Sequence, residues 1–98
     1  GYQDYYPALF GGVLVLKAEL GAIQVEQFFS AELKKVLEDN ITLVYSGETR
    51  LSGINNWEVF KGFVDKKPGV REGLTTIARL SNQALLALKI KDYSKLIS

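Results

Sequence analysis

Apolar residues near the start of the chain alternate with polar ones in a way that is typical of strands. Residues 13–19 form a continuous β-rich run, Gly21 supplies a turn, and residues 23–26 alternate between apolar and polar side chains. Two such runs separated by a glycine predict a β-hairpin. The side chains that we expect to face the core from this hairpin are Ile23, Val25 and Phe28 or Phe29.

Short helices are predicted on both sides of the hairpin. Residues 2–10 have the apolar spacing of a helix, in which Pro7 is tolerable only in the first turn, and a double glycine ends it. Ser30 is a good N-cap, and the apolar spacing after it predicts a helix of about ten residues that ends at Asp39 or Asn40. The hairpin is therefore expected between two helices.

One further strand and longer helices are predicted in the rest of the chain. Residues 41–45 are β-branched and apolar, which favours a strand, and residues 48–53 follow as a polar loop. A helix ending near Asp65 and a helix of about twenty residues after Gly69 are expected, because apolar residues recur there at three- and four-residue spacing. Asp92 is a candidate cap for a last helix. The predicted buried stripes are Ile54, Trp57, Phe60 and Val64 in the first helix and Val70, Leu74, Ile77, Ser81, Ala84 and Leu88 in the second. This order predicts an α+β fold, with a hairpin and a further strand packed against helices and a helical second half.

Composition restricts the chemistry more than the fold. A chain of 98 residues is long enough for one domain and too short for two. Its net charge is +1 with dispersed basic residues, and it has no long apolar run, so we expect no nucleic-acid and no membrane partner. Histidine and cysteine are absent, which leaves acid–base chemistry to carboxylates, lysines and tyrosines and is compatible with a cytoplasmic protein.

The ends of the chain indicate that it belongs to a longer polypeptide. It contains no methionine, and residues 92–98 have the pattern of a helix that has just started. We therefore expect a fragment. An incomplete sheet exposes apolar surface and unpaired strand edges, so self-association of the fragment is a further expectation.

Two charged residues are candidates for substrate chemistry. Asp4 stands among aromatic residues in the predicted short helix. A carboxylate in such a place can orient or deprotonate a hydroxyl group of a substrate. The alternative is an ordinary aspartate at a helix N-cap or in a turn. Arg50 lies in a polar loop and can bind a phosphate or carboxylate, with a surface arginine as the alternative.

Trp57 follows two asparagines, a pattern that suggests sugar binding, but its helical spacing favours core packing. No phosphate-binding loop or dinucleotide Gly-x-Gly-x-x-Gly motif occurs.

Taken together and in this order, the motifs resemble the GHMP small-molecule kinases. Residues 1–12, Gly-Tyr-Gln-Asp-Tyr-Tyr-Pro-Ala-Leu-Phe-Gly-Gly, resemble the segment of the sugar kinases, such as heptose 7-phosphate kinases and galactokinases, that reads Gln-Asp or Met-Asp, an aromatic residue and closing glycines before a strand. Residues 44–52, Val-Tyr-Ser-Gly-Glu-Thr-Arg-Leu-Ser, resemble the family's strand and Gly-x-x-Arg turn, and residues 53–59 resemble a variant in predicted sugar kinases. The resemblance covers nearly the whole chain.

The resemblance implies transfer of the γ-phosphoryl group of ATP to a hydroxyl of a sugar or sugar phosphate, with Mg²⁺ as a second cofactor. Asp4 matches the family's base or positioner for the acceptor, and Gln3, Tyr5 and Arg50 are the implied substrate-binding residues. Tyr5 stands where many relatives carry glutamine, so the acceptor pocket is expected to differ. The family's serine- and glycine-rich phosphate loop and its other glycine-rich motifs are missing from the chain. ATP and Mg²⁺ are therefore assigned to no residue, and the isolated fragment is expected to be inactive.

The resemblance also implies a partial GHMP kinase fold with two parts. Residues 1–29 would end the N-terminal domain, and residues 30–98 would begin the C-terminal domain. A mevalonate-type kinase stays open within the enzymes. A noncatalytic α+β binding or scaffold module is the alternative from another class.

Overall fold

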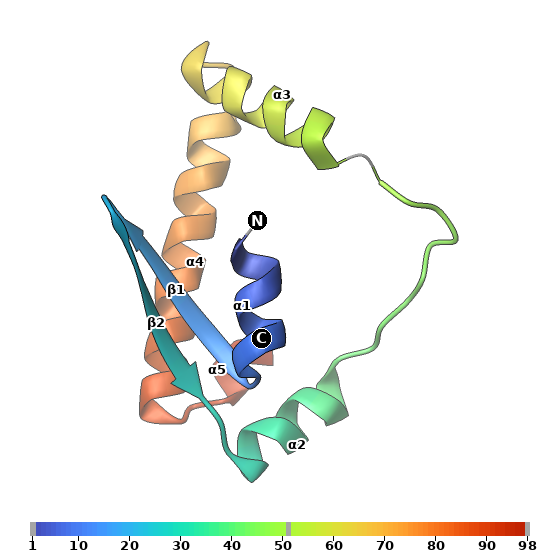
Figure 1. Cartoon of the computed structure of the whole chain (residues 1–98), viewed down its shortest axis with the longest axis vertical. Coiled ribbons are helices and arrows are strands. Elements are labelled where there is room, and N and C mark those ends of the chain that lie inside the picture. Colours follow the sequence, from blue (N-terminus) through green and yellow to red (C-terminus); the bar gives the residue numbers. More distant parts are fainter. Residues whose placement is uncertain (1, 51, 98) are drawn as a thin grey trace. The chain divides into compact units, whose positions relative to one another are not determined.

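The computed structural model describes residues 2–50 and 52–97 and has an α+β fold (Figure 1). In chain order its elements are α1 (Tyr2–Phe10), β1 (Val13–Glu19), β2 (Ala22–Phe28), α2 (Ala31–Asn40), α3 (Ser52–Val64), α4 (Val70–Ile90) and α5 (Ser94–Ile97). The chain forms two compact units, the first built from residues up to 42 and from 87 onward, the second from residues 43 to 86. The domain boundary expected between residues 29 and 30 stays a prediction.

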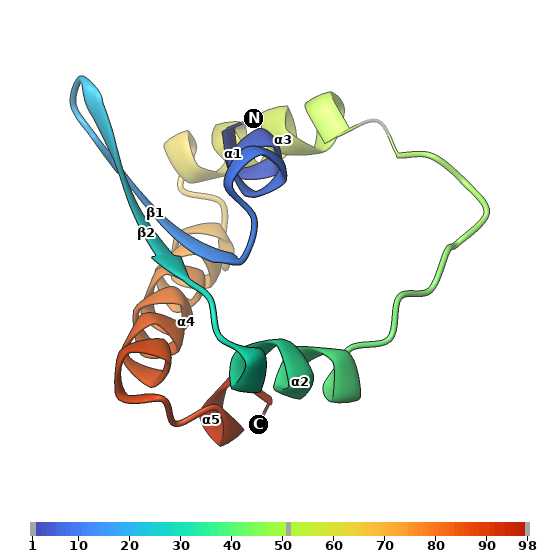
Figure 2. The same cartoon turned by 60° about the horizontal axis from the view of Figure 1, so that its bottom comes forward.

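The predicted hairpin is confirmed. β1 and β2 are antiparallel along their whole length, with Val13 opposite Phe28 at one end and Glu19 opposite Ala22 at the other (Figure 2). Gly21 closes the turn with a φ of 79°. Glycine adopts this left-handed conformation at little cost, and tight hairpin turns require it.

Burial along β2 departs from the predicted alternation. Ile23 and Phe28 are half-buried as expected, but Val25 is exposed, and so is Phe29. The expectation for Val25 was wrong because the core packs against the face of the hairpin that carries Val13, Val15 and Phe28. Val25 pairs with Leu16 and lies on the other face. Alternation along a strand shows which side chains share a face, but burial also needs a neighbouring element over that face.

The core of the first unit joins α2, α4 and α5 to this end of the hairpin. Leu33, Leu88 and Tyr93 are buried at its centre. The partly buried side chains packed around them are Val13, Val15, Phe28, Val36, Leu37 and Leu96. An ion pair between Lys89 Nζ and Glu26 Oε1, 3.7 Å apart, also joins α4 to β2. α2 is therefore held by apolar contacts that its helical spacing predicted.

α1 forms over the predicted residues, but Pro7 lies inside it and not in its first turn. Proline cannot donate the hydrogen bond that would join residue 7 to the carbonyl of Gln3. Aromatic pairs span the affected turns: Tyr2 and Tyr6 meet edge-on with ring centroids 6.4 Å apart, and Tyr6 stacks on Phe10 at 5.9 Å. These contacts offset part of the cost of Pro7.

The strand predicted over residues 41–45 does not form. The residues are in no regular secondary structure, and all five side chains are exposed. A strand is stable only with a partner, and within the described residues β1 and β2 pair with each other alone. The α+β class holds, but the further strand was a wrong prediction.

The helices of the second half occupy their predicted ranges, but the burial of their stripes was mostly overestimated. Leu88 is buried and Val70 and Ala84 are half-buried, whereas the remaining stripe residues are exposed. Trp57, expected in the core, is 62% exposed and stacks on Phe60 at 6.4 Å. Periodicity identifies a shared helix face and not the element that covers it. None of the helices in the described residues is both long and apolar enough to cross a membrane.

Asp92 lies just before α5, as the sequence suggested. Its carboxylate accepts a hydrogen bond from Ser94 Oγ at 2.7 Å, and its backbone carbonyl accepts one from the N–H of Lys95 at 3.2 Å. α4 ends at Ile90, and Lys91, the residue between this end and Asp92, has a φ of 58°. The N–H of Asp92 donates to the carbonyl of Ala87 at 3.0 Å, which is the hydrogen bond of a Schellman cap.

The glycines after α1 allow a paired stability test. Gly11 and Gly12 have φ values of 72° and 71°, but a Cβ on Gly11 would meet open space, whereas one on Gly12 would lie 2.9 Å from the backbone oxygen of Phe28. We expect Gly11→Ala to lower the free energy of unfolding of the first unit by about 1 kcal/mol, the cost of the left-handed backbone alone. Gly12→Ala should cost about 3 kcal/mol, because the carbonyl must also move. Amide hydrogen exchange in β1 and β2 measures both values, and equal costs would contradict the close approach.

Candidate functional site

Three of the four predicted site residues lie together on α1. Asp4 is exposed in the first turn of this helix, with Gln3 before it and Tyr5 after it, both also exposed. The N-terminal end of a helix carries a partial positive charge that favours a carboxylate. Successive helical residues point about 100° apart, so these three side chains diverge around the helix.

The aromatic residues of α1 gather on a different side from Asp4. Tyr2, Tyr6 and Phe10 follow each other at four-residue spacing, and Tyr5 stacks on Tyr6 with ring centroids 5.3 Å apart. Asp4 is two residues from Tyr6, which places it about 200° around the helix from that ring. The aromatic walls that the sequence suggested for this carboxylate are therefore not supplied by the aromatic stripe of α1.

The C-terminal end of α1 is built more tightly than its start. The N–H of Gly11 donates to the carbonyl of Pro7 at 2.8 Å, and the left-handed Gly11 completes an αL cap. From β2, Gln27 Nε2 donates to the carbonyls of Phe10 and Gly11 at 2.8 and 3.1 Å. The junction between α1 and the hairpin thus has a defined geometry.

Arg50 lies in the second unit, in the segment after a bend at Gly47 and Glu48. Gly47 has a φ of 87°, and the hydroxyl of Ser46 donates to the carbonyl of Glu48 at 3.2 Å. Arg50 itself is exposed. Gly1 and Leu51, which belong to the two kinase-like motifs, lie outside the described residues.

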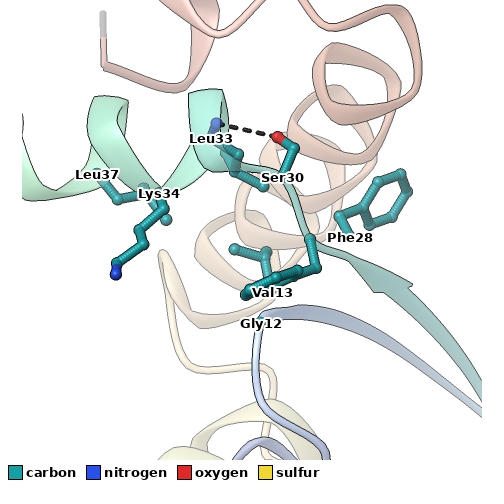
Figure 3. Close-up of a pocket in the computed structure, with 8 residues that line it drawn as sticks. Gly12, Val13, Phe28, Ser30, Leu33, Lys34 and Leu37 are labelled. Carbon is teal, nitrogen blue, oxygen red and sulfur yellow. Dashed lines mark hydrogen bonds between the residues drawn. The ribbon is translucent and has the colours of Figure 1, made fainter.

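An apolar pocket of about 250 Å³ lies where the hairpin meets α2 (Figure 3). Ser30 is the N-cap predicted for α2, and its Oγ accepts a hydrogen bond from the N–H of Leu33 at 3.0 Å beside the pocket. The residues that line the pocket are Gly12, Val13, Phe28, Phe29, Ser30, Leu33, Lys34 and Leu37. Sequence reasoning missed this pocket, because it depends on how residues distant in the chain pack. Its lining offers one cation, Lys34, and otherwise little for a polyphosphate to bind.

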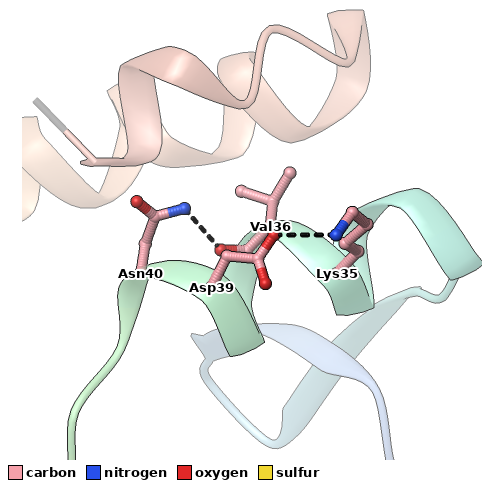
Figure 4. Close-up of polar contacts among 4 residues, drawn as sticks. All are labelled: Lys35, Val36, Asp39 and Asn40. Carbon is pink, nitrogen blue, oxygen red and sulfur yellow. Dashed lines mark hydrogen bonds and ion pairs between the residues drawn. The ribbon is translucent and has the colours of Figure 1, made fainter.

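The polar contacts of α2 stabilise that helix and do not form a site. Lys35 Nζ donates to Asp39 Oδ2 at 3.1 Å, and Asn40 Nδ2 donates to the carbonyl of Val36 at 2.8 Å (Figure 4). The second contact satisfies one of the carbonyls left unpaired at the helix end. These side chains are exposed, apart from the half-buried Val36, and exposed ion pairs of this kind are worth well under about 1 kcal/mol each.

The described residues do not assemble a site that fits ATP and Mg²⁺. They contain no group of three acidic side chains that could hold a metal ion. A hollow of about 410 Å³ in the second unit is polar, but its charged side chains are Glu58, Lys61, Asp65 and Lys67, two of each sign. A triphosphate needs concentrated positive charge and backbone N–H groups. Neither this hollow nor the apolar pocket supplies them.

Comparison with known proteins identified no relative of this chain. No protein family, curated protein or solved structure matches this chain.

Proposed function

We propose that this chain is part of a GHMP-type sugar kinase. In this proposal Asp4 is the carboxylate that binds the hydroxyl group of the phosphoryl acceptor. The observation that carries the proposal is the exposed Asp4 in the first turn of a short helix, whose end is fixed to a hairpin by Gly11, Gly12 and Gln27. The two glycines followed directly by β1 are the order that the kinase-like motif of residues 1–12 implies. Gly47, three residues before Arg50, has the left-handed backbone that the Gly-x-x-Arg turn of the second motif favours, but the strand that this motif places before it does not form.

In this proposal the residues of α1 bind and orient the acceptor. Asp4 accepts a hydrogen bond from the attacking hydroxyl and takes its proton as the new oxygen–phosphorus bond forms. The bond between the γ-phosphorus and the oxygen that bridges it to the β-phosphorus breaks at the same time, and ADP leaves. Phosphoryl transfer depends mostly on alignment, so holding the hydroxyl in line is the larger part of this role. Gln3 offers an amide donor and acceptor for neighbouring hydroxyls, and Tyr5 offers a ring face and a phenolic hydroxyl.

Arg50 is proposed to bind a phosphate or carboxylate of the acceptor through its planar guanidinium. ATP would supply the phosphoryl group and Mg²⁺ would neutralise its charge, but no residue of this chain is assigned to either. The nucleotide would be held by other parts of the polypeptide, which would work in the cytoplasm on a sugar or a sugar phosphate.

The chain alone should show no ATP affinity. We expect titration calorimetry of the 98-residue chain with Mg–ATP to give no binding heat at concentrations where intact kinases saturate, because the described residues offer no triphosphate site. Micromolar binding would show that the nucleotide site lies within this chain and would contradict the proposal.

The decisive experiment is phosphoryl transfer by the polypeptide that contains this chain. Labelled ATP is offered with a panel of sugars, sugar phosphates and mevalonate, and label should appear on a sugar hydroxyl. Transfer to mevalonate alone would identify an isoprenoid-alcohol kinase. No transfer to any acceptor, together with no serine- and glycine-rich loop encoded upstream of residue 1, would favour a noncatalytic α+β module.

A further inference from the structure

The side chain of Gln27 caps the C-terminal end of α1, the helix that carries Asp4. Gln27 lies on β2, yet its Nε2 donates to Phe10 O at 2.8 Å and to Gly11 O at 3.1 Å. A side-chain amide has two N–H donors, which is enough for one hydrogen bond to each carbonyl. This pairing joins residues that are 17 and 16 positions apart in the chain.

α1 depends on such contacts because it is short and interrupted. It has nine residues with Pro7 inside. Isolated helices of this length are unstable in water, and an internal proline weakens them further. The last carbonyls of a helix also have no partner within the helix. Gln27 satisfies two carbonyls at this end and ties them to the hairpin.

We propose that Gln27 is a positioning residue for Asp4. This inference rests on the proposed function of Asp4. Asp4 lies six residues from Phe10, or about 9 Å along the helix axis, so a tilt of about 10° at the tied end would move the carboxylate by about 1.5 Å. A misplacement of about 1 Å at a reacting group can lower a rate about a hundredfold. Gln27 thus sets the direction of α1 without touching the substrate.

The test compares substitutions that keep or remove the two donors. Gln27→Glu keeps the shape of the side chain but replaces its N–H donors with carboxylate oxygens, which cannot bond to the carbonyls of Phe10 and Gly11. Gln27→Lys keeps N–H donors for these two carbonyls. The matched control is Gln24→Glu. Gln24 is an exposed glutamine on the same strand, and within the described residues it shows no hydrogen bond to α1. Each variant is made in the polypeptide that contains this chain, with kcat, the KM values for ATP and acceptor, and amide hydrogen exchange as readouts.

We expect Gln27→Glu to lower kcat about tenfold to a hundredfold, to leave the KM for ATP unchanged and to speed exchange of the α1 amides. Gln27→Lys and Gln24→Glu should keep kcat within about twofold of the unsubstituted protein. An active protein in which Gln27→Glu leaves kcat unchanged would overturn this inference alone. A protein that transfers no phosphoryl group before any substitution would overturn the proposed function and this inference with it.

Discussion

Replacing Asp4 with alanine is expected to lower kcat at least about a hundredfold in the polypeptide that contains this chain, with little change in ATP binding. In the proposed function the carboxylate would contact the acceptor hydroxyl and not the nucleotide. Its exposed position in the first turn of α1 means that truncation leaves no cavity behind, so the fold should persist. Steady-state kinetics and calorimetry with ATP measure the two quantities separately.

One further variant separates the roles that Asp4 can have. Asp4→Asn keeps an oxygen that can accept a hydrogen bond but loses the charge and the ability to take a proton. A loss as large as that of alanine would indicate a base, and a much smaller loss would indicate a positioner. Glu32→Gln is the control, because Glu32 is an exposed acid in the first turn of α2. Near-normal turnover in Asp4→Ala would refute the role given to this residue.

The elements that could be predicted from the sequence are those decided by short-range interactions. The hairpin follows from alternating residues around Gly21, and α2 follows from Ser30 and the spacing after it. In both cases the residues that determine the element lie within a few positions of each other. Leu88 was a predicted core residue for the same reason, since helical spacing marks the face that packs.

The predictions that failed depend on partners that a local pattern cannot reveal. Residues 41–45 have strand propensity, but a strand needs an edge to pair with. Trp57 lies in an apolar stripe, but burial needs a covering element, and its side chain is exposed. The pairing of Gln27 with the end of α1 is non-local too, and no short motif indicates it. Of the candidate site, the placement of Asp4 on a helix was predictable, and its position about 200° around the helix from Tyr6 follows from the same helical spacing.

The core of the first unit is small, and Leu33 is the substitution site where we expect the largest loss of stability. Its side chain is 2% exposed and belongs to the buried cluster with Leu88 and Tyr93. Leu33→Ala should lower the free energy of unfolding of this unit by about 3 kcal/mol, from lost apolar burial and the cavity left behind. Leu20→Ala is the matched control, because Leu20 is fully exposed at the hairpin turn. It should change stability by less than about 0.5 kcal/mol.

The probe for this comparison must report on the first unit. Trp57 belongs to the second unit, so its fluorescence is a poor monitor of Leu33. Native-state amide exchange in α2 and β2 follows the affected elements directly. If α2 is held by the Leu33 cluster, its amides and those of β2 should lose protection together in Leu33→Ala, because Phe28 packs in the same cluster. Loss of protection in α2 alone would mean that the helix and the hairpin do not share one cooperative core.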